Sequence, residues 1–395
     1  MTMKDICYFD EPINRIGSGS YKWDTEGESG KRIPMGVADT DFHCPPQVIR
    51  AVCEKAKFGI YAYHEFPEER FRNAVAGWYR RRYGITLEKE AICHAQGIMT
   101  GALWMLILAL TNPGDGLIIQ EPVYHNFRTI TENMGRKVLS NNLIFKDGRY
   151  EIDWKDLEDK VNNPTTRMLL ICNPHNPVGR VWTKEELSRL CKICEKNHVV
   201  IISDEMHGDI VYKGHIHTPV FSIPGAEKFS IVMSGPGKTF NLSGFYSAYV
   251  VIRDPFMRIA YEKVYHQFHF DHNFMGTEAL ITAYNECEDY VEQQNQYFAE
   301  NIRITKEFLK ENIPELHIIE PEGGYLLWMD CRELGLPQTE LLELFAQWGV
   351  KLNDGSMYGE GGNGFLRVNI ATQRKVLLQA LECIKNGYSQ WKKSI

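Results

Sequence analysis

The sequence has no long hydrophobic run, no excess of basic residues and no visible signal peptide. Its longest apolar run, within residues 101–110, is too short to span a bilayer, and the N-terminal MTMKDICYFDEP has no apolar core that would direct export. The formal net charge is -7, from 44 basic and 51 acidic residues, which argues against a nucleic-acid-binding surface. We therefore expect a cytoplasmic protein without membrane or nucleic-acid partners.

Disulfide and metal patterns are also missing. The 10 cysteines are scattered, as is usual for reduced thiols in a cytosol. Cys191 and Cys194 form a CxxC, but the segment 183–194 begins like a capped helix, with Thr183 followed by Glu186. No further ligands occur at a spacing that suits a metal, so we interpret the two cysteines as neighbours on a helix face and expect no metal site.

The residues that are present are typical of an α/β protein. The chain has 395 residues, 44% of them hydrophobic and 24% charged, and this length exceeds one usual domain. Short apolar runs predict strands at residues 117–120, 168–172, 199–203 and 229–233. Amphipathic segments predict helices at residues 46–58 and 67–83. Apolar strands separated by helices indicate a parallel sheet covered on both faces.

The character of the chain changes after about residue 285. Here the patterns predict a long helix from 289 to about 312, β-rich stretches at 325–329 and 365–370, and a final helix from about 375 to 391. We therefore predict a large α/β domain over residues 46–285. A smaller α+β domain is predicted from residues 1–45 and 286–395.

Two polar groups come directly after predicted strands of the large domain. Asp204 comes after VVIIS, and Lys238 lies between glycines in SGPGKTFNLSG (residues 234–244), which comes after FSIVM. Ligands of open α/β sheets bind beyond the carboxyl ends of the strands, so an acid and a lysine are expected at one crevice. Taken alone, Asp204 could be structural and Lys238 a loop lysine or a phosphate binder. A P-loop is excluded because no GxxxxGK[ST] is present.

Two further motifs add amide donors and a phosphate-binding turn to the acid and the lysine. CNPHNPVG (172–179) comes after another strand, and its prolines and glycine favour a turn that offers asparagine amides. AQGIMTGA (95–102) has glycines before an expected helix N-terminus, which suits a phosphate. An amine, an acid, amide donors and a phosphate cradle together predict a pyridoxal 5'-phosphate site. Tyr124 is a candidate for stacking on the cofactor, or else a core tyrosine.

These motifs resemble a known family. NPHNPVG (173–179), SDEMH (203–207) and KTFNLSG (238–244) look like the fold-type I, class I/II aminotransferase superfamily, and most like its cystathionine β-lyase or C–S lyase branch. The resemblance covers roughly the whole chain. It implies the fold of PLP-dependent transferases, an α/β fold with a mainly parallel seven-stranded sheet, helices on both faces and a small α+β domain.

The resemblance also implies roles for individual residues. Lys238 would be the catalytic Schiff-base lysine, and Asp204 the partner of the ring nitrogen. The other implied cofactor contacts are Asn176 and His207 near the ring oxygen, Gly97, Ile98 and Ser234 at the phosphate, and Tyr124 on the ring. The implied substrate contacts are Ala38, Asp39, Tyr124 and Arg367, whose guanidinium suits a bidentate clamp on the α-carboxylate.

A further implied role concerns oligomerisation. Tyr63, in GIYAY (59–63), stands where the family has a tyrosine that reaches the phosphate of the neighbouring subunit. The resemblance therefore implies a homodimer with shared active sites. Tyr61 is close enough in sequence to be confused with Tyr63 in this role.

The choice between a lyase and an aminotransferase depends on the step after removal of the Cα proton. Many aminotransferases of the superfamily have an arginine eight residues after the lysine, where this chain has Tyr246. The lysine motif and PMGVADTDF (34–42) resemble the C–S lyase branch instead. We expect α,β-elimination of L-cystathionine or related cysteine S-conjugates to thiol, pyruvate and ammonia. The alternative is an aminotransferase that acts on an L-amino acid.

A function of another class, binding to a protein partner, also stays open. The chain could bind a protein partner as a regulator of transcription and keep some lyase activity, whereas direct binding to DNA is not expected.

Gly36 stands where the branch commonly has tryptophan, and Thr40 where it commonly has methionine. If this segment lines the site for the substrate side chain, we expect a roomier pocket.

Overall fold

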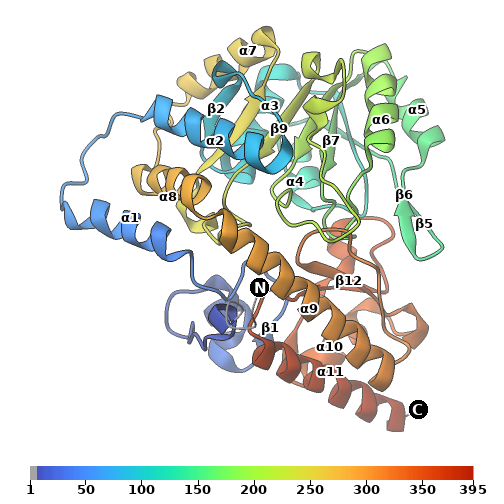
Figure 1. Ribbon diagram of the computed structural model, residues 1–395. Coiled ribbons are helices and arrows are strands. Elements are labelled where there is room, and N and C mark those ends of the chain that lie inside the picture. Colours follow the sequence, from blue (N-terminus) through green and yellow to red (C-terminus); the bar gives the residue numbers. More distant parts are fainter. Residues whose placement is uncertain (1–6, 395) are drawn as a thin grey trace.

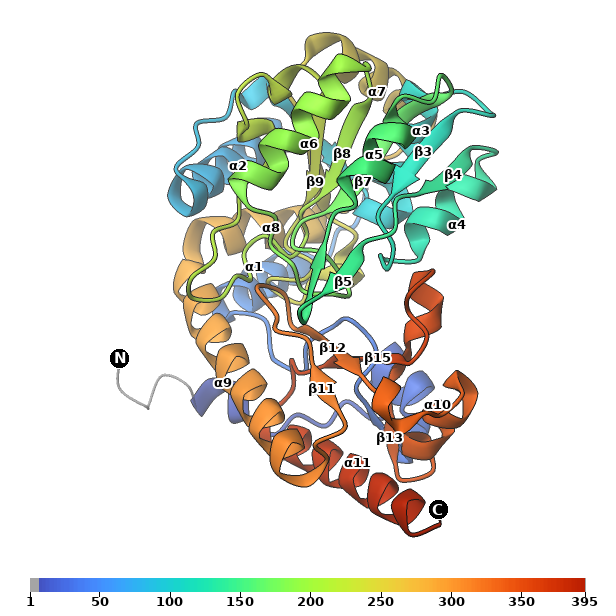
Figure 2. The ribbon, with the colours of Figure 1, turned by 90° about the vertical axis from the view of Figure 1, so that its right-hand side faces the viewer.

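The computed structural model describes residues 7–394, and side chains from residue 9 to residue 393. Residues 1–6, which belong to the predicted small domain and to the N-terminal MTMKDICYFDEP, lie outside the described residues. Figure 1 and Figure 2 show a larger layered part that contains most of the helices, and a smaller part that contains the C-terminal end. The first described residues lie beside the smaller part.

A seven-stranded sheet forms the centre of the larger part. In spatial order its strands are β2 (Ile92–Ala95), β10 (Ala248–Ile252), β9 (Ser230–Ser234), β8 (Val200–Asp204), β7 (Thr166–Cys172), β3 (Gly116–Ile119) and β4 (Lys137–Ser140). Neighbouring strands run parallel except where β10 pairs with β2 and β9. The four expected strands correspond to β3, β7, β8 and β9, and the mainly parallel α/β fold is confirmed.

The helices alternate with these strands and then continue into the smaller part. They are α1 (Pro46–Lys57), α2 (Glu68–Tyr83), α3 (Leu103–Leu110), α4 (Asn126–Asn133), α5 (Trp154–Val161), α6 (Lys184–Lys196), α7 (Pro255–Gln267), α8 (Phe274–Glu286), α9 (Glu288–Asn312), α10 (Gln338–Ala346) and α11 (Arg374–Ser394). Thr183 and Glu186 form the expected capping box of α6, and Cys191 and Cys194 are buried free thiols on that helix. Within residues 7–394, no helix is both long and apolar enough to cross a membrane.

Helices cover both faces of the seven-stranded sheet because its strands are apolar on both sides. Along β7, Leu169 and Ile171 join a core with residues of α2, α5, α6 and α8. Met168 and Leu170 point the other way and join a core with residues of α3, α4 and α7. The continuous apolar run of β7 is therefore what a central strand between two helical layers requires.

The smaller part is built on a four-stranded antiparallel sheet. Its strands, in spatial order, are β11 (His317–Ile318), β12 (Leu326–Asp330), β15 (Phe365–Asn369) and β14 (Asn353–Asp354). Two strand pairs lie outside the main sheets: β1 (Ile33–Pro34) with β13 (Val350–Lys351), and β5 (Ile144–Lys146) with β6 (Arg149–Glu151). In Figure 1 the long helix α9 runs from α8 along this part toward α10 and α11.

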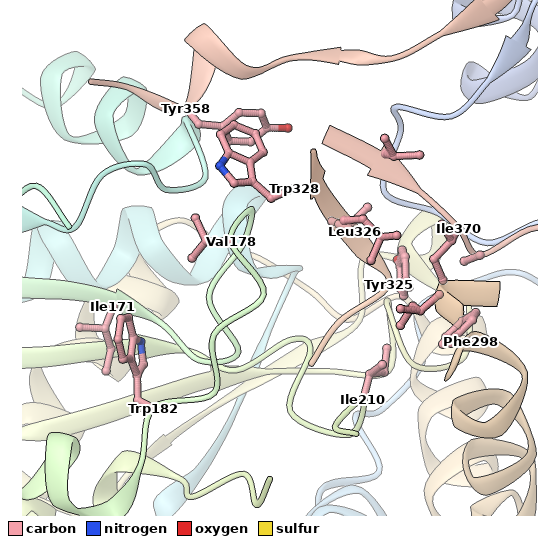
Figure 3. Close-up of a cluster of buried hydrophobic side chains, with 14 of the residues drawn as sticks. Ile171, Val178, Trp182, Ile210, Phe298, Tyr325, Leu326, Trp328, Tyr358 and Ile370 are labelled. Atoms are coloured by element: carbon pink, nitrogen blue, oxygen red, sulfur yellow. The ribbon is translucent and has the colours of Figure 1, made fainter. Parts of the chain in front are cut away.

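The hydrophobic core continues from one part into the other. Figure 3 shows Ile171 and Trp182 near the large sheet, and Tyr325, Trp328 and Phe298 beside the small one, all within one buried cluster. Burying each such large side chain contributes roughly 1.5–3 kcal/mol, so the two parts are packed firmly together. The division into domains at residues 45/46 and 285/286 stays a prediction.

Candidate active site

A cavity of about 210 Å³ lies at the carboxyl ends of β7, β8 and β9. Eight of the residues implied by the resemblance line it: Ala38, Gly97, Ile98, Tyr124, Asn176, Asp204, His207 and Lys238. Further lining residues are Met99, Thr100, Cys172, Met206, Gly237, Leu242, Ser243, Tyr246, Ser247 and Ala248. The parallel strand order explains this gathering, because the carboxyl ends of parallel strands meet at one edge of the sheet.

Lys238 projects into the cavity from the turn after β9. Its Nζ donates a hydrogen bond of 2.6 Å to the carbonyl oxygen of Ala38. Burial lowers the pKa of Lys238 to about 8; the charge of Asp39 opposes this shift, and the charge of Arg367 adds to it. The amine is therefore partly neutral near physiological pH, as a nucleophile or a general base must be.

Close packing explains why the lysine has a glycine neighbour. A Cβ on Gly237 would lie 2.9 Å from the Cε of Met206 and 3.1 Å from the Oγ of Ser243, so a side chain there would require Met206 to shift. Thr239, on the other side of the lysine, donates from its Oγ1 to the Oδ2 of Asp209 over 2.9 Å. These contacts hold the backbone on both sides of Lys238.

Asp204 ends β8 as a fully buried carboxylate. Its Oδ1 accepts one hydrogen bond of 3.1 Å, from the backbone N–H of Met206. Burial raises its pKa to about 6, although the Met206 N–H and the charge of Lys238 lower it. A buried acid with a single donor suits a ligand that brings an N–H or a positive charge.

His207 lines the same cavity as a neutral ring. Burial lowers its pKa to about 3, and the charges of Lys238 and Arg367 add to this effect. Its Nδ1 is buried without a hydrogen-bond partner among the described residues, and its ring packs edge-on against Tyr325. A neutral imidazole in this position can exchange one hydrogen bond with a ligand.

Arg367, on β15, is a buried arginine, only 3% exposed. Its Nη1 donates to the Oδ1 of Asn176 over 3.1 Å, and its Nη2 donates to the carbonyl oxygen of Gly36 over 2.7 Å. Its Nε has no partner among the described residues. A buried guanidinium is costly when no carboxylate contacts it, and none of the described residues provides one, so a ligand carboxylate fits here.

The end of the cavity near Gly97 has the features of an anion site. Gly97 adopts a left-handed φ of 72°, and no side chain caps the helical stretch that begins at Ile98. Ser247 also lines the cavity, and its buried Oγ has no partner among the described residues. Sequence reasoning missed Ser247 and Thr100, although Thr100 lies two residues after Ile98 in the quoted AQGIMTGA motif.

Four of the implied residues do not line the cavity: Ser234, Tyr63, Asp39 and Arg367, although Asn176, the hydrogen-bond partner of Arg367, does. Ser234, at the end of β9, donates its hydroxyl to the carbonyl oxygen of Glu205 over 3.3 Å. Tyr63 is 99% exposed. Asp39 forms an ion pair of 2.9 Å with Arg15 instead.

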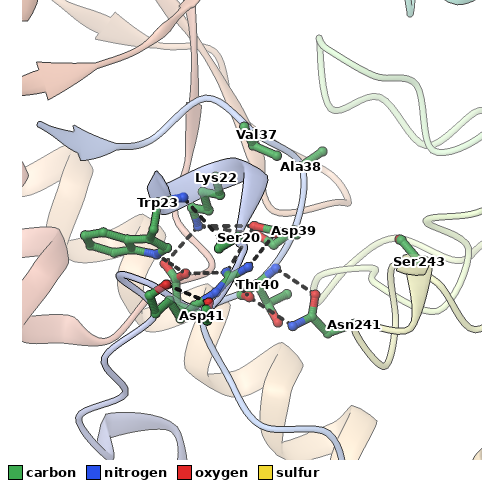
Figure 4. Close-up of polar contacts among 12 residues, drawn as sticks. Ser20, Lys22, Trp23, Val37, Ala38, Asp39, Thr40, Asp41, Asn241 and Ser243 are labelled. Atoms are coloured by element: carbon green, nitrogen blue, oxygen red, sulfur yellow. Dashed lines mark hydrogen bonds and ion pairs between the residues drawn. The ribbon is translucent and has the colours of Figure 1, made fainter. Parts of the chain in front are cut away.

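Asp39 belongs to a buried cluster of charges that sequence reasoning missed. Figure 4 shows Lys22, Trp23 and Asp41 of this cluster around Asp39. The Nζ of Lys22 lies 2.8 Å from Asp41, which Arg15 also contacts at 2.7 Å. Burial alone would raise the pKa of Asp41, but the ammonium of Lys22 lowers it below its usual value. The cluster holds the segment that carries the carbonyl of Ala38.

The surroundings of Gly36 bear on the expectation of a roomier pocket. A Cβ on Gly36 would lie 2.1 Å from the Oδ1 of Asn353. The space that a larger residue would fill is therefore taken by the carboxamide of Asn353, and the absence of a side chain at residue 36 leaves no extra room on that side.

The residues around the cavity fit pyridoxal phosphate. Its ring nitrogen, ring oxygen and phosphate would match, in turn, the carboxylate of Asp204, the polar atoms of Asn176 and His207, and the end of the cavity at Gly97 and Ser247. The lysine amine lies among them. Several buried polar atoms here lack partners among the described residues, which native proteins rarely tolerate without a ligand.

Proteins with known names are similar to this chain over nearly its whole length. The family model described as aminotransferase class I and II matches residues 31–384. Cystathionine beta-lyase PatB of Bacillus subtilis (strain 168) is 35% identical over 387 residues, which cover 96% of this chain and 100% of PatB.

Solved structures agree with this match. Cystalysin from Treponema denticola, which contains a pyridoxal 5'-phosphate cofactor, superposes with a TM-score of 0.93 at 31% identity, over 97% of this chain and 99% of cystalysin. The PLP-bound C–S lyase from Staphylococcus hominis has a TM-score of 0.88 at 28% identity, over 96% and 98% of the two chains.

Proposed function

We propose that this chain, which belongs to the aminotransferase class I and II family, is a pyridoxal-phosphate-dependent carbon–sulfur β-lyase. It cleaves L-cystathionine or a related cysteine S-conjugate to a thiol, pyruvate and ammonia. The observation that carries this proposal is the pairing, in a relative of PatB, of a cavity-lining amine, Lys238, with a buried guanidinium, Arg367, whose hydrogen-bond partner Asn176 lines the same cavity. The same chain lacks the arginine typical of many aminotransferases, with Tyr246 at that position.

Pyridoxal phosphate, when bound, supplies an aldehyde that holds the substrate amine and a ring that accepts electrons from Cα. Asp204 would contact the ring nitrogen, and its buried carboxylate would keep a proton there. Asn176 and His207 would contact the ring oxygen, and Tyr124 the ring face.

The phosphate would lie at the end of the cavity that Gly97 and Ile98 form. Thr100 and Ser247 add hydroxyl groups at that end. Ser234 stays a predicted phosphate contact, and to reach the phosphate its hydroxyl would have to leave the carbonyl of Glu205.

The substrate would be oriented by its α-carboxylate. Arg367 has its Nε without a partner among the described residues, and a hydrogen bond to Asn176 fixes the plane of the guanidinium. Such a fork can bind both oxygens of one carboxylate and so point Cα toward Lys238. Ala38 and Tyr124 would contact the rest of the substrate, and Asp39 would act from outside the cavity, through its charge.

Lys238 is the base of the reaction. Its amine, with a pKa of about 8, takes the proton from Cα, and the carbonyl of Ala38 steadies the resulting ammonium. The Cβ–S bond then breaks, and sulfur leaves with the bonding electron pair as a thiolate. The ammonium of Lys238 is the proton donor in the cavity that can neutralise this leaving group.

We further propose a homodimer in the cytoplasm. Tyr63 lies in an exposed apolar segment with Phe58, Ile60 and Tyr61, whose exposed fractions are 70%, 57% and 62%. Such a segment is typical of a surface that a second copy covers, and the homodimer implied by the resemblance needs Tyr63 at the partner's phosphate.

Pyruvate release from L-cystathionine tests the function. We expect release by the protein loaded with pyridoxal phosphate, and a loss of about 10²–10⁴-fold in kcat for Lys238→Ala. Lys228→Ala, which removes an exposed lysine outside the cavity, is the matched control and should keep full activity. Transfer of the amino group to a keto acid without pyruvate release would contradict a lyase. Full activity in Lys238→Ala would contradict the role of that lysine.

A further inference from the structure

Gly36, Asn353 and Arg367 lie side by side because the strands that carry or precede them are paired in register. β1 pairs with β13 in the register Ile33 to Val350 and Pro34 to Lys351, and continuing this register brings Gly36 opposite Asn353. On its other side, Asn353 of β14 is the register partner of Arg367 in β15. Asn353 therefore stands between the N-terminal segment and the guanidinium proposed to bind substrate.

The fit between Gly36 and Asn353 is close. A Cβ at residue 36 would lie 2.1 Å from the Oδ1 and 2.9 Å from the Cγ of Asn353, so the asparagine can hold its position only beside a glycine. The carbonyl oxygen of the same glycine accepts the 2.7 Å hydrogen bond from the Nη2 of Arg367. One residue thus provides both the space for Asn353 and an acceptor for the arginine.

Asn353 connects to Arg367 through Tyr358. Its Nδ2 donates a hydrogen bond of 3.2 Å to the hydroxyl of Tyr358, and the guanidinium carbon of Arg367 lies 5.0 Å from the centre of the tyrosine ring. Such a cation–π contact is favourable when both groups are shielded from water.

Tyr358 itself is held from several sides. Its carbonyl accepts a hydrogen bond of 3.0 Å from the N–H of Val123, and its ring packs edge-on against Trp328, as Figure 3 shows. Tyr358 is 1% exposed and does not line the cavity, so it can affect the substrate only through a neighbour. That neighbour is Arg367, whose guanidinium lies over its ring.

We propose that Asn353 and Tyr358 are positioning residues that hold the guanidinium of Arg367 for recognition of the substrate carboxylate. The proposal rests on the proposed function only in that Arg367 binds that carboxylate. The hydrogen bond from Asn353 fixes the tyrosine ring, the ring supports one face of the guanidinium, and Gly36 and Asn176 fix its two terminal nitrogens. With these three supports in place, Nε and the second N–H of each terminal nitrogen remain for the ligand.

Two substitutions break the hydrogen bond from opposite ends. Asn353→Ala removes the donor, and Tyr358→Phe removes the acceptor but keeps the ring under Arg367. Each should raise the KM for L-cystathionine about fivefold, the effect of losing one hydrogen bond, with kcat within about twofold of wild type. The double variant should be no worse than either single one, because both remove the same bond.

A third substitution reaches Asn353 from the other side. Gly36→Ala should raise KM in the same way, because its Cβ displaces the carboxamide of Asn353. Combined with Asn353→Ala the same change meets no carboxamide, so the pair should behave like Asn353→Ala alone. Asn142→Ala is the matched control: it removes an amide bonded over 2.9 Å to Glu360, near Tyr358 in sequence, and should leave KM unchanged.

Binding of the carboxylate can be measured without turnover. L-Alanine and L-alaninamide differ only in that group, so the ratio of their dissociation constants, from absorbance titration of the loaded protein, reports on Arg367. We expect the preference for alanine to fall about fivefold in Asn353→Ala and Tyr358→Phe, with affinity for the amide unchanged. Arg367→Lys, which removes the guanidinium, shows how far the preference for alanine over the amide falls when Arg367 itself is lost.

Unchanged KM and unchanged preference in Asn353→Ala and Tyr358→Phe would overturn the proposal. So would a double variant whose effect is the product of the single effects, since the two residues would then act separately. Failure of the lyase assignment looks different: wild type would release no pyruvate, while its preference for alanine over the amide would still respond to these substitutions.

Discussion

Asp204 is a buried carboxylate whose side chain accepts one hydrogen bond from the described part of the chain, from the N–H of Met206. Burial raises its pKa to about 6, compared with 3.8 for the free side chain. Ionisation of this buried carboxylate destabilises the folded protein when no cofactor is bound. A positively charged ring nitrogen beside it would remove that destabilisation. Strain of this kind is typical of functional sites, where stability is exchanged for activity.

Asp204→Asn should therefore stabilise the cofactor-free protein near pH 8. There the carboxylate is ionised in both the folded and the unfolded chain, and its raised folded pKa makes this ionisation cost up to about 3 kcal/mol. Asparagine keeps an oxygen that can accept the hydrogen bond from Met206 but carries no charge. Urea unfolding at several pH values measures the difference in free energy of unfolding.

The sign of the pH dependence gives the sharper test. Because the folded pKa is raised, the carboxyl group favours the folded state at low pH, and this contribution is lost as pH rises through about 6. The amount by which the free energy of unfolding of Asp204→Asn exceeds that of wild type should be smaller at pH 5 than at pH 8. Asp159→Asn, an exposed change on α5, should show no such trend. An Asp204→Asn variant less stable than wild type at pH 8 would contradict this explanation. We expect Asp204→Asn to be a poor lyase whatever its stability.

At the scale of elements, the segment from residue 34 to residue 42 depends on charges that it does not carry itself. Lys22 is fully buried, with its Nζ 2.8 Å from the nearly buried carboxylate of Asp41. The Nε1 of Trp23 donates to the same carboxylate over 2.7 Å. These contacts fix a segment with little regular structure, and the carbonyl that meets Lys238 is part of it.

Lys22→Met should be strongly destabilising, because it leaves the carboxylate of Asp41 buried with fewer partners. Breaking a buried pair from one side costs about 3–5 kcal/mol. The double variant Lys22→Met/Asp41→Asn should recover part of that loss, as measured by urea unfolding at pH 7. Lys306→Met, which breaks an exposed pair with Glu320, is the control and should change little. If Lys22→Met were as stable as wild type, the charge cluster would contribute nothing to the free energy of unfolding.

The low pKa of Asp41 predicts how this contribution varies with pH. A carboxyl group whose pKa is lowered by folding stabilises the folded state above its unfolded pKa, and the effect fades as acid protonates it. The difference between wild type and Lys22→Met should therefore narrow on acidification. This is the opposite trend to that of Asp204.

The elements that the sequence predicts well are those with local signals. β7, β8 and β9 are continuous apolar runs, and α6 begins with a capping box, so short windows suffice. The placement of the residues at the ends of these strands results from the parallel order alone. This is why the positions of Asp204 and Lys238 at one crevice could be predicted.

The parts that sequence reasoning missed depend on distant pairings. Lys22 and Arg15 gain a role only when Asp41 and Asp39 fold against them, and no spacing in the sequence marks this. Asn353 meets Gly36 through strand pairs between segments far apart in the sequence, so the sequence did not show that a carboxamide stands beside Gly36. Ser247 lies where β10 begins its antiparallel course, which the parallel pattern did not predict.

At the scale of the whole molecule, the proposed dimer can be tested by mixing subunits. Each site would need Lys238 from one subunit and Tyr63 from the other. Lys238→Ala and Tyr63→Ala dimers should both be weak, but random exchange would give hybrids in which one of the two sites is intact. An equimolar mixture, dissociated and reassembled, should then regain about a quarter of wild-type pyruvate release.

The control for this experiment is a pair of defects in the same subunit. A chain with both Lys238→Ala and Tyr63→Ala, mixed with wild type, gives hybrids with no fully intact site. No gain of activity in the first mixture, with hybrids present by native mass spectrometry, would rule out a shared site and leave Tyr63 without a role there.

The pairing of β1 with β13 has a consequence for biosynthesis. The segment that covers Lys238 is made before the seven-stranded sheet, but its strand partner is made about 300 residues later. The seven-stranded sheet, complete by Ile252, can assemble while the ribosome is still extending the chain. The crevice at its edge is then still uncovered, so the nascent protein passes through a stage in which a cofactor can enter from solution before the two ends of the chain meet over it.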